Sequence, residues 1–426
     1  MRILLISNLF PPDSDGGMEV NALKVAAGLR GRGHDVQVLT SHFRRGFRPQ
    51  EPEPEWVHRV FRLARPWSPQ WVGLRHKPHL AAALLHEVAT LRANRRAVDA
   101  WVGDQTFDVV YGFGMSLIGG GVTEPLSRRG VPVFWHLGGG YLESRFVRAP
   151  VESVFLRLRR RWLAVEDRLD FRYVGFVSRH LERMCEDAGF FAGPGAECRR
   201  RFIVARGVDF ARRADVERQR EQPPVILMAG RILSIKGFHL AVEAASQLHR
   251  RRPDLAWILR IVGEPDRLDV DQETGDGYYA RLQGLVDQLG LASRVEFAGR
   301  RSRAELLELM AGATVFVSAS TCGEGFANTI IESMGSGTAL VASIDGSSLE
   351  QVVPNESALV YDAHDVPALS HHLESLLADS DLRLKIARGG VERIRSCFTL
   401  DRVLDQTEHV LGEIVRDNQE HPRSYR

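Results

Sequence analysis

A single stretch of this sequence constrains the fold more than any other, because it reads as a strand, a glycine-rich turn, a helix and a second strand. Residues 313–318 and 338–343 are short apolar runs rich in β-branched side chains, as in buried strands. Between them, residues 328–334 have a helical pattern that ends at Gly335 and Gly337. A turn of this kind presents backbone N–H groups and the positive end of the helix dipole to a ligand. The stretch therefore predicts an α/β fold with an anion site, for which phosphate is the usual occupant.

Two carboxylates lie on either side of the helix start. Glu324 is in the turn and Glu332 is in the helix, at most ~12 Å further along its axis. Carboxylates repel phosphate but accept hydrogen bonds from sugar hydroxyls, so the stretch suits a ligand made of a sugar, a diphosphate and a ribose. Taken alone, a simpler interpretation is favoured, in which Glu324 caps the helix and Glu332 is a solvated surface residue.

The sequence Glu324-Gly325-Phe326, followed by the second glutamate at 332, resembles the two-glutamate donor signature of family 4 glycosyltransferases. These are retaining enzymes of the GT-B fold. The resemblance implies two Rossmann-like, doubly wound parallel-sheet domains that face each other across a cleft, with a C-terminal helix that crosses back. It also implies that Glu324 holds the donor sugar and Glu332 the ribose. The backbone expected to bind the donor comprises Gly325, Phe326, Ala327, Asn328 and Thr329.

The length of the chain and a second start of the strand–helix–strand pattern indicate two domains. With 426 residues, each domain can bury its own core. The pattern restarts at Pro224, after a charged stretch that begins at Ala211. We therefore expect domains over residues 1–210 and 211–398, and the resemblance implies that the first binds the acceptor and the second binds the donor. The resemblance implies that residues 399–426 form a helix that returns to the first domain.

Composition excludes several classes of protein. The net charge of +2 argues against a chain built mainly to hold nucleic acid. The four cysteines are scattered without a Cys-x-x-Cys pair, which indicates free thiols in a reducing compartment. No segment reaches the ~18 apolar residues of a membrane span, and the apolar run at the N-terminus is too short for a signal peptide. We expect a cytoplasmic protein.

A glycine pair follows the first predicted strand. Residues 3–7 read as a buried strand, and Gly16 and Gly17 precede a helical pattern over residues 18–30. Glycines at this position let the backbone approach a phosphate or a sugar closely, although such a pair usually marks only a turn. A strand, then Pro-Pro, then Gly-Gly before a helix is similar to the start of family 4 chains. The resemblance implies donor-binding roles for both glycines, and we add Gly263, which follows a predicted strand at 257–262.

A histidine ends another predicted strand. Residues 131–137 are largely apolar, and His136 precedes three glycines at 138–140. This places an imidazole at the carboxyl edge of the sheet, where open α/β sheets bind ligands. In the family, a histidine at this strand end faces the transferred sugar, and His136 matches it. Many members continue with Asp, whereas this chain has Leu137, so no role for a following Asp is carried over.

Two cations project from one loop near the start of the second half. Arg231 follows the strand at 225–229, and Lys236 precedes the next helical pattern. Two cations in one loop can clamp a diphosphate and stabilise the charge that builds on it as it leaves. Basic loop residues are mostly solvated, but Gly-Arg followed by Lys-Gly matches the diphosphate-binding pattern of the family. The implied catalytic set is His136, Arg231, Lys236 and Glu324.

We predict no metal site. Asp13-Ser14-Asp15 matches the Asp-x-Asp of the other main glycosyltransferase fold, but it precedes a nucleotide-binding unit instead of following one. Residues 269–271 carry a similar pair of aspartates in a polar stretch. The expected co-substrate is a nucleoside diphosphate sugar, with no cofactor. A basic helix with arginines between Arg157 and Arg161 suggests peripheral membrane contact, although a solvated helix face is the favoured reading.

The resemblance implies transfer of a sugar from the donor to an acceptor hydroxyl by same-face substitution, in which the leaving phosphate takes the acceptor proton. The acceptor, the sugar, the base and the oligomeric state are left open. The alternatives are a nucleotide-sugar 2-epimerase on the same fold and a non-catalytic nucleotide-sugar-binding protein. A serine hydrolase is poorly supported, because no Gly-x-Ser-x-Gly elbow is present. An NAD fingerprint at residues 112–117 is incomplete at Leu117.

Overall fold

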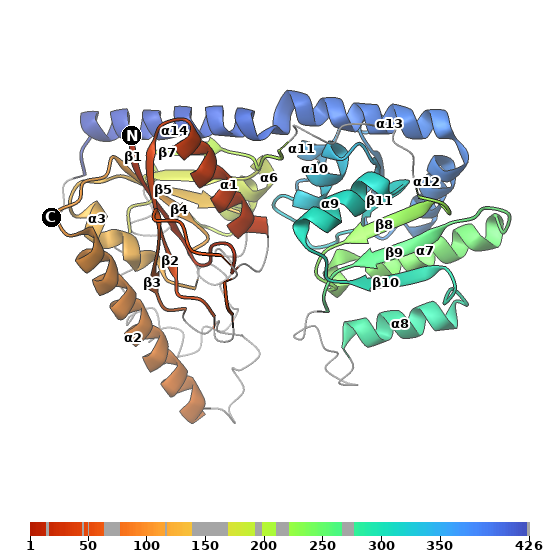
Figure 1. Ribbon diagram of the computed structural model, residues 1–426, viewed down its shortest axis with the longest axis horizontal. Helices are drawn as coiled ribbons and strands as arrows, with labels where there is room; N and C mark the ends of the chain where they lie inside the picture. Colours follow the sequence, from red (N-terminus) through yellow and green to blue (C-terminus); the bar gives the residue numbers. More distant parts are fainter. Residues whose placement is uncertain are drawn as a thin grey trace. The chain divides into compact units, whose positions relative to one another are not determined.

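The computed structural model describes residues 1–13, 17–44, 47–49, 51–63, 77–115, 117–138, 169–191, 198–209, 221–265 and 277–423. The chain divides into two compact units (Figure 1). Unit 1 comprises Met1–Ala205 and Val403–Arg426, and unit 2 comprises Arg206–Arg402. The assignment of an acceptor-binding and a donor-binding domain to these parts stays a prediction.

Unit 1 is built on a seven-stranded sheet in the order β3-β2-β1-β4-β5-β6-β7, and every pairing is parallel. The strands are β1 (Arg2–Ser7), β2 (Asp35–Ser41), β3 (Val57–Phe61), β4 (Val109–Phe113), β5 (Val133–Leu137), β6 (Tyr173–Phe176) and β7 (Arg200–Ile203). The helices are α1 (Gly17–Gly31), α2 (Lys77–Val102), α3 (Glu124–Ser127), α6 (Arg179–Asp187) and α14 (Leu400–Glu420), with a 3-10 turn η3 (Gly120–Thr123). Strands β4 and β5 are buried throughout, as their nearly continuous apolar sequences predict.

Unit 2 contains a six-stranded parallel sheet in the order β10-β9-β8-β11-β12-β13. The strands are β8 (Val225–Ala229), β9 (Ile258–Val262), β10 (Val295–Gly299), β11 (Val315–Ser318), β12 (Ala339–Ile344) and β13 (Leu359–Asp362). The helices are α7 (Phe238–Arg251), α8 (Tyr278–Gln288), α9 (Arg303–Gly312), α10 (Asn328–Gly335), α11 (Ser348–Gln351), α12 (Val366–Ala378) and α13 (Ser380–Arg393), with a 3-10 turn η5 (Ser234–Lys236) and a short π-helix η6 (Ile394–Phe398). The strand, turn, helix and strand predicted over residues 313–343 are confirmed as β11, α10 and β12.

The strand order places a switch point in each sheet. In unit 1, β1 lies between β2 and β4, and in unit 2, β8 lies between β9 and β11. At such a point the crossovers leave toward opposite sides, which opens a crevice outside the carboxyl ends of the two central strands. In unit 2 the loops at this crevice are the one that carries Arg231 and Lys236 and the one that carries Glu324.

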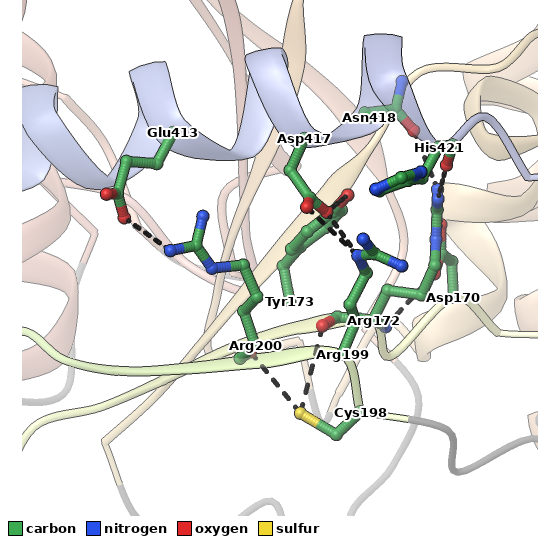
Figure 2. A network of polar contacts seen from close by, with 10 residues as sticks. All are labelled: Asp170, Arg172, Tyr173, Cys198, Arg199, Arg200, Glu413, Asp417, Asn418 and His421. Atoms are coloured by element: carbon green, nitrogen blue, oxygen red, sulfur yellow. Dashed lines mark hydrogen bonds and ion pairs between the residues drawn. The ribbon is translucent and has the colours of Figure 1, made fainter.

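The last helix, α14, belongs to unit 1 from Val403 onward. Its buried side chains include Val403, Leu404 and Leu411, and a Cβ atom at Gly28 of α1 would meet the Leu404 side chain at 2.4 Å. Figure 2 shows the polar contacts near the C-terminal end of this helix. Tyr173 donates a hydrogen bond of 2.7 Å to Asp417, and Arg199 binds the same carboxylate at 2.8 Å. The helix is therefore fixed by an apolar stripe and by a set of charged partners.

Within the described ranges, none of the helices has the length and apolar character that a membrane span requires. Gly16, the glycines at 139–140, the basic segment Arg157–Arg161 and the aspartates at 269–271 lie outside the described residues. Their predicted roles stay predictions.

Candidate functional site

The loop after β8 brings its two predicted cations to the switch point of unit 2. Arg231 is exposed directly after the strand, and Lys236 ends the short turn η5. Gly237 then takes a left-handed φ of 68° at the start of α7, and a Cβ atom there would lie 2.0 Å from the Ala319 carbonyl oxygen. Only glycine fits this close approach. The amide of Thr321 donates to the Ile235 carbonyl at 2.9 Å, so the loops after β8 and β11 are held side by side.

Lys236 and Glu324 meet across these two loops. Lys236 Nζ lies 2.8 Å from Glu324 Oε2, and the side chains are 24% and 28% exposed. A partly exposed ion pair of this kind contributes less than about 1 kcal/mol, because water screens both charges. A diphosphate can therefore replace Glu324 as the partner of Lys236 at small cost, which leaves the carboxylate available to sugar hydroxyls.

The N-terminus of α10 borders the same loop. Ala327 is the N-cap residue, its side chain supplies no capping hydrogen bond, and the first turn carries no acidic residue. A helix end of this kind leaves backbone donors for an anion. Arg206 adds positive charge, since its Nη1 lies 3.2 Å from the Phe326 carbonyl and 3.3 Å from Asn328 Oδ1.

One of the amides expected to serve the donor already has a protein acceptor. The Ala327 amide donates to Gln351 Oε1 at 3.1 Å, and Gln351 Nε2 donates to the Ala327 carbonyl at 2.8 Å. Gln351 is fully buried. Ala327 therefore fixes the entry into α10 through both of its backbone groups, and sequence spacing gave no sign of this partner.

Glu332 is not a solvated surface residue, contrary to the simpler interpretation of the sequence. Its side chain is 5% exposed, and Oε1 lies 2.7 Å from Arg303 Nη2 at the start of α9. A buried carboxylate needs such a partner, because removing either charge leaves the other without compensation. Contact between Glu332 and a ribose stays a prediction.

Gly263 occupies a position that admits no side chain. A Cβ atom there would lie 1.8 Å from the Gly230 carbonyl oxygen, and its amide donates to the Gly299 carbonyl at 3.0 Å. This glycine packs the ends of β8, β9 and β10 together, a structural reason for its presence. Its expected role in donor binding stays a prediction.

His136 lies at the end of β5 in unit 1 and is 4% exposed. Its Nδ1 lies 2.8 Å from the Tyr111 hydroxyl and its Nε2 lies 2.9 Å from the Val204 carbonyl. A carbonyl only accepts, so Nε2 carries the proton and Nδ1 accepts from Tyr111. Burial raises the pKa of Tyr111 far above its usual range, which keeps this hydroxyl a donor.

A small cavity adjoins His136 and is lined also by Met18 and Gly138, at the carboxyl edge predicted for a ligand. Contact of His136 with a sugar stays a prediction. Gly17 is the first residue of α1. The other described site residues, namely Arg231, Lys236, Gly263, Glu324 to Thr329 and Glu332, all belong to unit 2.

The first aspartate of the discounted Asp-x-Asp has a structural partner. Asp13 is fully buried and accepts hydrogen bonds from the Arg44 backbone amide at 2.8 Å and from Arg44 Nε at 2.7 Å. Among the described residues, no group of three or more His, Cys, Asp or Glu side chains could hold a metal ion.

Two family models match this chain. Residues 209–393 match "Glycosyl transferases group 1" and residues 16–169 match "Glycosyl transferase 4-like domain". The D-inositol 3-phosphate glycosyltransferase of Acidothermus cellulolyticus is 29% identical over 88% of this chain and 81% of that protein. The enzyme of the same name from Salinispora tropica is 30% identical over 51% of this chain and 46% of that protein. Several other curated relatives are matched over only 45% to 49% of their length.

Solved structures share the fold at low sequence identity. The sucrose-phosphate synthase of Thermosynechococcus elongatus has a TM-score of 0.71 at 20% identity, and the match covers 98% of this chain and 99% of that chain. Anabaena Alr3699/HepE in complex with UDP-glucose has a TM-score of 0.64 at 19% identity, over 97% and 100% of the two chains. The two family models together show that this chain belongs to the group 1, family 4-type glycosyltransferases, and the solved structures share its GT-B fold of two parallel sheets.

Proposed function

We propose that this protein transfers a sugar from a nucleoside diphosphate sugar to an acceptor hydroxyl, with the anomeric configuration retained. The observation that carries the proposal is the Lys236–Glu324 pair, which lies at the switch point of unit 2 beside the N-terminus of α10. One cation for a diphosphate and one carboxylate for sugar hydroxyls are thereby set next to a helix end that favours phosphate.

In the proposed mechanism, the protein acts mainly on the leaving diphosphate. Arg231, Lys236 and the backbone donors at the start of α10 stabilise the negative charge that develops as the glycosidic bond breaks. The departing phosphate oxygen takes the proton of the acceptor hydroxyl on the same face of the sugar, so no carboxylate nucleophile is required. Glu324 holds the sugar, whereas the sugar-facing role that the resemblance implies for His136 stays a prediction, because both of its ring nitrogens have protein partners.

The comparisons suggest which substrates to test first. The solved complex of Alr3699/HepE contains UDP-glucose, and the two named curated relatives act, by their names, on D-inositol 3-phosphate. UDP-glucose and D-inositol 3-phosphate are therefore the first donor and acceptor in a panel that also includes GDP-mannose, ADP-glucose and phosphorylated sugars. The 2-epimerase alternative gains no support from the named relatives, and it predicts a changed sugar without any acceptor.

Arg231→Ala and Lys236→Ala should each lower kcat by about 100-fold or more, because each removes a charge that stabilises the leaving diphosphate. Release of the nucleoside diphosphate is measured over the panel, and product NMR establishes the anomeric configuration. Lys385→Ala removes an exposed lysine from α13 and should leave turnover unchanged. Turnover near the wild-type level in Arg231→Ala and Lys236→Ala would refute the assignment.

A further inference from the structure

The backbone of the loop that carries Glu324 is bound by residues 345–347, in the turn that follows β12. Asp345 directs both carboxylate oxygens at one backbone amide, that of Gly323, at 3.0 and 2.9 Å. Its Oδ2 also lies 3.5 Å from the Glu324 amide. A carboxylate is the strongest acceptor that a side chain offers to a backbone N–H group. Asp345 therefore fixes the peptide N–H of Gly323, directly before Glu324, and makes a longer contact with the N–H of Glu324 itself.

The same turn fixes the carbonyl side of Glu324. The Ser347 amide donates to the Glu324 carbonyl at 3.0 Å. Between Asp345 and Ser347, Gly346 takes a left-handed φ of 57°, and a Cβ atom there would lie 2.3 Å from the Glu324 carbonyl oxygen. The turn thus approaches the backbone of Glu324 as closely as glycine allows.

The backbone amides before α10 and those at its start have different partners. Asp345 carries a negative charge, which repels phosphate, and its oxygens accept from the amides before the helix. The backbone donors that suit a diphosphate lie further along, at the start of α10, where no acidic residue is present in the first turn. The side chain of Glu324 projects from the clamped peptide and contacts Lys236 at 2.8 Å.

We propose that Asp345 is a positioning residue for the donor: it fixes the backbone of Glu324 so that this carboxylate meets the sugar while Lys236 binds the diphosphate. The inference rests on the proposed function, because it assigns the sugar and the diphosphate to these two side chains. It predicts that loss of Asp345 weakens the contribution of the sugar to binding more than the contribution of the nucleotide.

The experiment has one part that needs no ligand. Hydrogen exchange of the ligand-free protein is compared for wild type, Asp345→Ala, Asp345→Asn and Asp362→Ala. Asp362 is an exposed aspartate at the end of the neighbouring strand β13, and it serves as the matched control. Exchange of the amides at 323–324 should be about tenfold faster in Asp345→Ala, since one hydrogen-bonded acceptor is lost. It should be unchanged in Asp362→Ala. An unchanged exchange rate in Asp345→Ala would show that the Asp345 carboxylate does not hold these amides, independently of which ligand the protein binds.

The second part uses calorimetry with matched ligands: UDP and UDP-glucose, GDP and GDP-mannose, ADP and ADP-glucose. For the pair that wild type binds, Asp345→Ala should weaken the nucleotide sugar about tenfold and the nucleoside diphosphate less than about threefold. Asp345→Asn keeps one acceptor oxygen and should give an intermediate value. An equal loss for both ligands would reduce Asp345 to a structural role and overturn the inference. If wild type binds none of these ligands, the proposed function is overturned, and so is the predicted effect of Asp345 on sugar binding. Hydrogen exchange would still show whether Asp345 holds the backbone at 323–324.

Discussion

At the scale of single residues, Arg303 and Glu332 form an ion pair beside the proposed donor site. Glu332 is 5% exposed and has Arg303 as its partner at 2.7 Å. The pair joins the start of α9 to α10, so it supports the helix whose first turn borders the predicted phosphate site. Its loss is therefore expected to act on stability before it acts on any ligand.

Arg303→Ala should lower the free energy of unfolding by about 3 kcal/mol, because it leaves a buried carboxylate without a partner. Glu332→Gln in the same chain removes that uncompensated charge, so the double variant should recover most of the loss. Urea unfolding of the wild type, both single variants and the double variant measures the coupling. Additive losses in the double variant would show that the two charges are independent.

Gly237 offers a test of close packing between the two loops. Gly237→Ala places a Cβ atom 2.0 Å from the Ala319 carbonyl oxygen, whereas Gly290 has a similar φ of 68° and nothing within 4 Å of its Cβ position. Gly290→Ala should cost about 1 kcal/mol, the strain of the left-handed backbone alone. Gly237→Ala should cost at least twice as much, as measured by urea unfolding. If both variants lose the same free energy of unfolding, the loops after β8 and β11 can move apart to accommodate the added methyl group.

At the scale of elements, α14 makes unit 1 sensitive to acid. Burial alone would raise the pKa of Asp417, but the hydrogen bonds from Tyr173 and Arg199 outweigh it and lower that pKa below its usual value. Glu408 behaves alike: burial opposes ionisation, and Arg32 and His34 lower its pKa overall. A carboxyl whose folded pKa is depressed contributes stability above its unfolded pKa and loses it as the pH falls through the folded pKa.

The contribution of Asp417 should therefore be complete above about pH 4, the pKa of an unfolded aspartate, and should vanish progressively below it. Asp417→Asn should destabilise the protein at pH 7, and its difference from wild type should shrink progressively as the pH falls below about 4. Thermal unfolding of both proteins across this range measures the difference. Tyr173→Phe removes only the hydroxyl that donates to Asp417 at 2.7 Å, so it should show the same trend with smaller amplitude. A difference between wild type and Asp417→Asn that stays constant with pH would contradict this account.

At the scale of the whole chain, the pattern of apolar residues was sufficient to predict the regularly alternating strands and helices. Apolar runs predicted β1, β8 and β11, and Gly335 and Gly337 predicted the end of α10, because these signals are local. The residues that hold the Glu324 loop were not predictable in this way. Asp345 and Gln351 contact positions 22 and 24 residues earlier in the chain, and the pairing of Glu332 with Arg303 depends on which helices are neighbours. The family resemblance indicated the candidate site residues, but only the structure shows which residues hold them in place.

Calorimetric titration with UDP-glucose, GDP-mannose and ADP-glucose tests the central claim most directly, namely that unit 2 binds a nucleoside diphosphate sugar through Lys236. The account predicts that wild type and Lys385→Ala bind one of these donors equally well, and that Lys236→Ala binds it at least about tenfold more weakly, since a charged hydrogen bond is lost. Equal affinity in Lys236→Ala, or no binding of any donor by wild type, would contradict it.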